Sequence, residues 1–222
     1  GNYQACAIAT NDRAYCWGYG EDGQLGKATS KTIFAPSTPV TSGDSLLGPF
    51  LTFRPIQLGR TYGCGVSVAK QMYCWGRVNG DAVQASPTAV VFTPPTTVNT
   101  IATGERHHCM TTPSGLAYCT GTNDEGELGD GTVTTAASGT YPAVLPALST
   151  WSMLAAGSLH TCGMPRYAGA GTVTPFCWGF NSSGQIGDGT TGTKLIPTAV
   201  TLPALVTELD STSLVVGAAH SC

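Results

Sequence analysis

The sequence predicts an all-β protein, and three observations lead to this class. Glycine (29 residues) and proline (14 residues) are abundant in the 222-residue chain, and Ser/Thr-rich stretches separate short apolar runs. Hydrophobic residues make up 41% of the chain and charged residues only 10%, so enough apolar material is present to bury a core. One short phrase, a glycine and a cysteine separated by four residues, recurs along the whole chain. These features predict many short strands joined by turns and arranged as repeats.

The recurring phrase divides the chain into repeats. It stands at 1–6, 59–64, 104–109, 157–162 and 217–222. We therefore expect a single array over 1–222, with repeats 1–58, 59–103, 104–156 and 157–216 and a stub at 217–222. In a closed ring of four repeats, the stub and the first phrase would need the same place. We expect the 222 residues to be a piece of a longer chain for that reason.

The cysteines follow the repeats. Eight of the nine form pairs, separated by ten positions in three repeats and by fifteen in the fourth. The pairs are Cys6 with Cys16, Cys64 with Cys74, Cys109 with Cys119, and Cys162 with Cys177. Turn residues such as Pro113 and Gly115 lie at the midpoint, so each interval predicts a β-hairpin with its cysteines opposite each other. Opposed residues lie close enough for a disulfide, and we predict four of them, with Cys222 unpaired in this chain.

Metal binding is the alternative for these cysteines. His107, His160 and His220 each stand two residues before a cysteine, but the first two repeats carry Gln4 and Tyr62 at that position. Zinc sites also use closely spaced C-x2-C pairs, which are missing here. We favour structural strand histidines and predict no metal and no cofactor. Disulfides form in oxidising compartments, so we expect an extracellular or cell-surface (secreted) protein.

A second phrase contains the second cysteine of each pair. It has the form aromatic-Cys-Trp-Gly and leads into a glycine-rich turn at 15–26, 118–132 and 176–190. A strand containing proline comes next, and an apolar run precedes each glycine phrase. Four antiparallel strands per repeat are typical of a propeller blade. The predicted fold is thus a β-propeller of four-stranded antiparallel blades, with about four blades plus the start of a fifth, as part of a larger propeller.

Taken together, the two phrases resemble the regulator of chromosome condensation repeat, whose family folds as a seven-bladed β-propeller. The fourth repeat fits this pattern best. The second repeat lacks the GQLG turn, and in the third Thr120 replaces the tryptophan found at 17, 75 and 178. The paired cysteines resemble the secreted and cell-surface versions of the repeat. The resemblance implies roughly three more blades in the full protein and, as in a bacterial β-lactamase inhibitor of this fold, protein binding through a loop face.

Several functions are disfavoured by the sequence. The net charge of −3 and ten scattered Lys and Arg residues do not form a phosphate-binding face, so no nucleic acid is expected. No run is long enough to span a membrane, and we expect no direct membrane insertion. Nucleophile motifs such as G-x-S-x-G are absent, so no catalytic residue is proposed. Asp130 and Asp188 recur in G-D-G-T turns, which lack the ligand series of a calcium loop.

The sequence therefore predicts a non-enzymatic extracellular scaffold or protein-binding module, as part of a surface, matrix or filament assembly. Its partners would be other proteins or copies of itself, bound through loop faces. The alternative is a ligand-recognising sensor or receptor ectodomain. Asn181 in the N-S-S sequon is the N-glycosylation candidate, because its loop is expected to be exposed. The competing interpretation is that Asn181 only shapes its turn, as Asn123 would in the third repeat.

Overall fold

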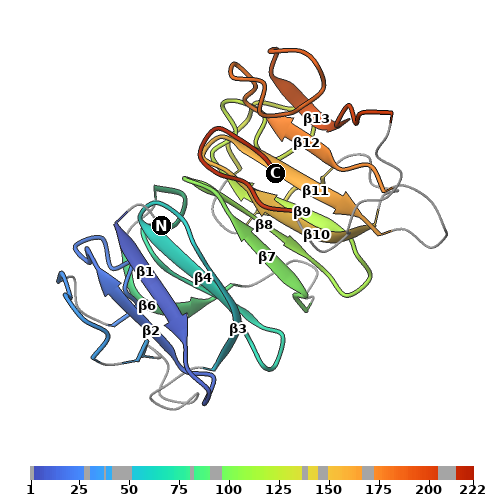
Figure 1. Ribbon diagram of the computed structural model, residues 1–222. Helices are drawn as coiled ribbons and strands as arrows, with labels where there is room; N and C mark the ends of the chain where they lie inside the picture. Colours follow the sequence, from blue (N-terminus) through green and yellow to red (C-terminus); the bar gives the residue numbers. More distant parts are fainter. Residues whose placement is uncertain are drawn as a thin grey trace.

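The computed structural model describes the chain except for 1–2, 28–30, 38, 42–51, 81–82, 91–96, 137–139, 145–149, 167–172 and 205–213. Its regular elements are almost all short strands (Figure 1). They are β1 (Gln4–Ile8), β2 (Ala14–Gly18), β3 (Phe53–Leu58), β4 (Tyr62–Ser67), β5 (Met72–Gly76), η1 (Val78–Gly80, a 3-10 turn), β6 (Gln84–Ala89), β7 (Thr100–Thr103), β8 (His107–Thr111), β9 (Ala117–Gly121), β10 (Trp151–Ala156), β11 (His160–Pro165), β12 (Phe176–Gly179) and β13 (Lys194–Ala199). Nothing helical in the described ranges is both long and apolar enough to cross a membrane.

The strands form one antiparallel sheet per repeat, and we call each sheet a blade. Blade 2 has the order β3-β4-β5-β6 and blade 4 the order β10-β11-β12-β13. Blade 3 contains β7-β8-β9, and a bridge between Tyr118 and Ala143 adds its outer edge. Blade 1 contains β1 and β2, with Ile33 and Pro39 bridged to the outer side of β2. The predicted all-β class with four-stranded antiparallel blades is confirmed.

The first strands of successive blades lie next to one another. β7 of blade 3 contacts both β3 of blade 2 and β10 of blade 4, and β3 also contacts β1, the strand of blade 1 that carries Cys6. Residues 214–216 line the same cleft as β7 and β10. They also pair with the last residues of the chain, because Val215 and Cys222 exchange two backbone hydrogen bonds. This pairing repeats the register of Ala102 with Cys109 and of Ala155 with Cys162.

The hydrophobic core is distributed between the blades. Between blades 1 and 2, Leu25 and Val40 pack with Phe53 and Trp75. Between blades 3 and 4, Leu128 and Val144 pack with Trp151 and Trp178. Blades 2 and 3 each lie between two other blades and bury both faces, which explains why β4 and β8 are buried along their whole length.

Candidate functional site

Four disulfides stand at the same place in the four blades. The structure joins Cys6 to Cys16, Cys64 to Cys74, Cys109 to Cys119, and Cys162 to Cys177. Each pair is in direct cross-strand register, with Cα atoms 4.0–4.1 Å apart. Cys222 is a free, exposed thiol. Most of the longer connection within the fourth cysteine pair, between Pro165 and Pro175, lies outside the described residues.

The glycine of the repeated phrase touches the ring that follows it three residues later. A Cβ atom on Gly104 would lie 2.2 Å from the His107 ring and 2.6 Å from the carbonyl oxygen of Gly157 in the next blade. A Cβ on Gly157 would meet the His160 ring at 2.2 Å and the carbonyl of Gly217 at 2.5 Å. No residue with a side chain fits between these groups, so glycine recurs at every blade start that the structure describes.

The residue after this glycine links each blade to the next through the backbone. The amide of Arg60 donates to the carbonyl of Glu105 at 3.3 Å, Glu105 to Ser158 at 3.4 Å, and Ser158 to Ala218 at 3.3 Å. The Arg60 and Glu105 side chains also form an ion pair, at 2.6 Å. The blade starts are therefore hydrogen-bonded in series.

The side chain two residues before each first cysteine also reaches the next blade. Gln4 donates to the carbonyls of Gly59 and Tyr62, and the Tyr62 hydroxyl donates to the carbonyl of His107. His107 Nε2 shares a hydrogen bond with Thr161 Oγ1 at 2.9 Å.

The histidines in this series are neutral structural residues. Burial lowers the pKa of His107 to about 3 and that of His160 to about 4. His160 Nε2 lies 3.0 Å from Ser221 Oγ, which continues the series to the C-terminal residues. Glutamine, tyrosine and histidine can all occupy this position because the polar end of each side chain is long enough to form a hydrogen bond with the next blade.

The GQLG turn receives the tryptophan of the next blade. Trp75 Nε1 donates to the backbone carbonyl of Gln24 at 2.9 Å, and Trp178 Nε1 donates to that of Glu127 at 2.9 Å. Glu127 replaces the glutamine of the other turns and is fully buried, so desolvation raises the pKa of its carboxyl group to about 7. Its Oε2 accepts a hydrogen bond from the amide of Glu125, as the side-chain oxygens of Gln24 and Gln185 do in their own turns.

The junction between blades 2 and 3 departs from this pattern. Blade 2 lacks the GQLG turn, and blade 3 has Thr120 in place of tryptophan. His108, directly opposite Thr120 in the sheet, supplies the ring instead. It lies against Tyr62 and Tyr141, and its Nε2 is 2.9 Å from the Tyr141 hydroxyl. The two departures in the sequence therefore belong to one interface.

Asn181 is buried, so the expectation that this side chain is exposed is wrong, while its glycosylation stays a prediction. Its Nδ2 donates to the carbonyls of Thr190 and Gly192, both at 3.1 Å, and its Oδ1 accepts from the amide of Ile186 at 2.9 Å. Asn123 makes the equivalent bonds in blade 3. An N-linked glycan would have to be attached to the Nδ2 that holds this loop together. The alternative interpretation, that Asn181 shapes its turn, agrees with the structure.

The two repeated aspartates complete these loops. Asp130 accepts from the amide and the hydroxyl of Thr132, and Asp188 does the same with Thr190. Asp188 also pairs with Lys194 at 2.8 Å, and these bonds hold the pKa of its carboxyl group well below the usual range. The Asn181 amide group occupies the centre of the oxygen cluster in its loop, where a cation would otherwise have to lie.

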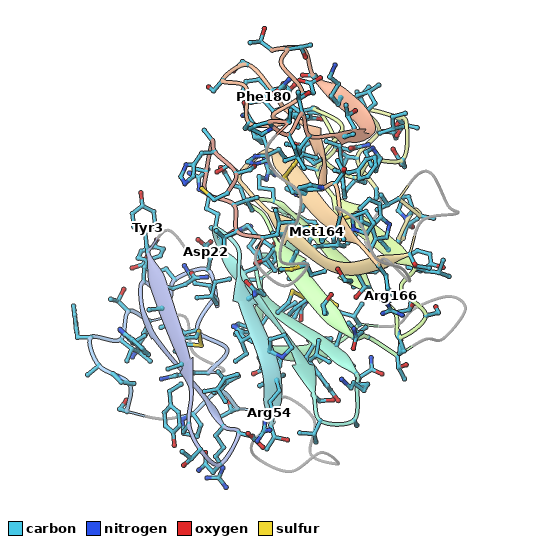
Figure 2. The ribbon with its side chains drawn as sticks, turned by 45° about the vertical axis from the view of Figure 1, so that its right-hand side comes forward. Tyr3, Asp22, Arg54, Met164, Arg166 and Phe180 are labelled. Carbon is cyan, nitrogen blue, oxygen red and sulfur yellow. A yellow bond between two sulfur atoms is a disulfide. The ribbon has the colours of Figure 1, made fainter. Side chains whose placement is uncertain are left out.

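One end of the blades carries side chains that change from repeat to repeat while the backbone stays constant. In every blade, the residue after the glycine of the aromatic-Cys-Trp-Gly phrase donates its backbone amide to a carbonyl group. That carbonyl belongs to the residue directly before Gln4, Tyr62, His107 or His160. The pairs so joined are Tyr3 with Tyr19, Thr61 with Arg77, Arg106 with Thr122, and Leu159 with Phe180. We call these four pairs the loop face. Figure 2 shows Tyr3 and Phe180 at the upper ends of their sheets, on the loop face. Arg54 lies at the lower end of β3, away from this face.

Among known proteins, residues 175–222 match the family model described as "Regulator of chromosome condensation (RCC1) repeat". The human E3 ubiquitin-protein ligase HERC2 is 29% identical over 168 residues, which cover 72% of this chain and 3% of HERC2. The human probable E3 ubiquitin-protein ligase HERC6 is 25% identical over 222 residues, covering 95% of this chain and 21% of HERC6. The chain thus spans a small fraction of these relatives.

Two solved structures have a similar fold over the whole chain. Human WBSCR16 superposes with a TM-score of 0.81 at 20% identity and is covered over 55% of its length. Yeast RCC1 (Prp20), in its complex with Kap60, superposes with a TM-score of 0.76 at 18% identity and is covered over 51% of its length. At such identities the likeness establishes the fold, which is that of an RCC1-type propeller.

Proposed function

We propose that this chain is a non-enzymatic protein-binding module. It would work in an oxidising environment, outside the cell or on the cell surface. The proposal starts from the regulator of chromosome condensation repeat that the chain carries and from its RCC1-type propeller fold. The observation that carries the proposal is the set of four disulfides at one position of every blade. Cytosolic reductants keep such pairs open, so a repeated framework of this kind suits secreted proteins.

The loop face is the surface we assign to the partner, which is another protein or a second copy of the chain. Its backbone is the same in each blade, whereas its side chains are aromatic in blade 1, basic in blades 2 and 3, and apolar in blade 4. Exposed aromatic and arginine side chains are the usual anchors of protein interfaces. Tyr3 is 69% exposed and Tyr19 39%.

The compartment is tested by peptide mapping of the protein from its natural source, without reduction and with free thiols blocked at once. We expect the four linked pairs and a blocked Cys222. Recovery of the eight paired cysteines as free thiols would refute the oxidising compartment.

The binding surface is tested with the variant Tyr19→Ser/Phe180→Ser. Photo-crosslinking of the natural protein first identifies the partner, and its affinity for both proteins is then measured. We expect the variant to bind at least tenfold more weakly at an unchanged melting temperature. Val68→Ser is the control, because Val68 is 62% exposed in the turn after β4, at the opposite end of the blades. Equal loss in both variants would count against the loop face.

A further inference from the structure

A ring from the following blade packs near the disulfide in three of the blade junctions. Trp75 shares a core cluster with Cys16, and Trp178 shares one with Cys109 and Cys119. Between blades 2 and 3 the ring is the imidazole of His108. One of its nitrogens lies within 4.8 Å of both Cys64 Sγ and Cys74 Sγ, and all three residues are buried. An indole has no nitrogen lone pair for a metal, whereas an imidazole has one.

The two nitrogens of His108 have different surroundings. Nε2 is hydrogen-bonded to the hydroxyl of Tyr141, and Nδ1 is buried without a hydrogen-bond partner in the part of the chain that the structure describes. His108 is 1% exposed. Histidines that bind metals usually hold the second ring nitrogen in a hydrogen bond that fixes the ring, which is the role Tyr141 would have here.

We propose that Cys64, Cys74 and His108 form a zinc-binding site once the Cys64–Cys74 disulfide is reduced. A dithiol reductant supplies two electrons and two protons to the disulfide and is itself oxidised to a disulfide. Zinc then displaces both thiol protons, so two thiolates neutralise the charge of the cation. With three protein ligands, the fourth position of a tetrahedral zinc ion is left for water.

The distances suit this exchange. Zinc bonds of about 2.0–2.3 Å place neighbouring ligand atoms about 3.5–4 Å apart, within the 4.8 Å span of the present cluster. The two sulfur atoms need only move apart once their bond is broken, on strands that stay paired. The proposal is independent of the compartment argued above, since it concerns the chain wherever a reductant opens this bond.

The first test is a titration of the fully reduced protein with Co2+, which reports thiolate ligation by its absorption. We expect one equivalent to bind tightly, with the charge-transfer band of a two-thiolate site. His108→Gln should weaken binding at least tenfold. His107→Gln, one residue earlier and directed to blade 4, is the matched control and should leave the affinity unchanged. Equal binding by His108→Gln and the parent would overturn the proposal.

A second test avoids global reduction, in case the reduced protein unfolds. In a Cys222→Ser background, Cys74→Ser frees the Cys64 thiol while the other three disulfides remain. Cys119→Ser frees Cys109 at the same position of blade 3, where the ring is Trp178. We expect Cys74→Ser to bind Zn2+ at least tenfold more tightly than Cys119→Ser, measured by competition with a chromophoric chelator. Equal affinities of these two oxidised variants would refute the site, whatever the reduced protein does.

Discussion

Single residues explain why a short phrase recurs at the start of each blade. The glycine is needed because an aromatic or histidine ring lies against its α-carbon and the next blade supplies a carbonyl oxygen on the same side. The ring in turn hydrogen-bonds across the junction, as His107 does with Thr161. The spacing of glycine, ring and cysteine therefore records contacts between blades as well as the hairpin within one.

Gly104→Ala is expected to be strongly destabilising. The new Cβ would lie 2.2 Å from the His107 ring and 2.6 Å from the backbone of Gly157, and the backbone cannot give way cheaply. Overpacking of this kind costs about 1–3 kcal/mol, and we expect at least about 2 kcal/mol by denaturant unfolding. Gly192→Ala is the control, since nothing lies within 4 Å of its Cβ position. Similar stabilities of the two variants would contradict this explanation.

Glu127→Gln is expected to stabilise the protein at neutral pH. Burial raises the pKa of Glu127 to about 7, above its unfolded value of 4.5. The unfolded chain therefore ionises first, and the stability of the parent falls as pH rises from about 4.5 to about 7. Glutamine removes this loss, and we expect a gain of about 1–3 kcal/mol at pH 8 and little difference at pH 4.

The measurement is urea unfolding of parent and variant across this pH range. Glu21→Gln, which removes an exposed carboxylate from the corresponding turn of blade 1, serves as the control and should leave the pH profile of the parent unchanged. A pH-independent difference between Glu127→Gln and the parent would show that the carboxyl group is not the cause.

At the scale of the elements, the two central strands of a blade carry a large ring at one position and a small residue directly opposite it. Gly63 stands opposite Trp75, and Thr161 opposite Trp178. In blade 3 the order is reversed, because His108 stands opposite the small Thr120. The space between blades is filled in each case, and only the strand that supplies the ring differs.

This exchange predicts a specific coupling between two substitutions. Thr120→Trp alone should destabilise the protein by about 1–3 kcal/mol, because His108 already occupies the space. The double variant His108→Thr/Thr120→Trp recreates the arrangement of blade 4 and should recover part of that loss. The melting temperatures of the parent, both single variants and the double variant give the coupling energy. Strictly additive effects would show that the two positions do not share one space.

At the scale of the whole molecule, the blades are held in series by contacts between residues far apart in sequence. Hydrogen bonds join Gln4 to Tyr62, 58 residues later, and His160 to Ser221, 61 residues later. Each blade is stabilised by its neighbours, as in other repeat proteins. Burial differs between blades accordingly: β4 and β8 are buried throughout, whereas Ala7 and Ile8 at the end of β1 are exposed.

Hydrogen exchange should reflect this difference. Among the described strands, β1 pairs only with β2, while β4 pairs on both sides with β3 and β5. We expect the hydrogen-bonded amides of β1 to exchange at least tenfold faster than those of β4, because less packing must be broken to open them. β8 is the control and should resemble β4. Equal protection of all three strands would indicate that the chain opens only as one unit.

Much of this fold could be predicted from the sequence. The strand pattern, the blade class and the two cysteines that face each other follow from hairpins of about ten residues, whose register depends on nearby turn residues such as Pro113 and Gly115. Because these interactions are local, the spacing alone specifies them.

Only the tertiary structure decided the rest. The burial of Asn181 depends on its loop. Gly187 and Gly189 have positive φ there, and the carbonyl groups that accept hydrogen bonds from Asn181 point inward. The position of His108 beside Cys64 and Cys74 depends on how two blades pack. A repeat pattern in the sequence gives the position of a residue within its own blade. The pattern does not show which side chains of the next blade, about fifty residues away, pack against that residue.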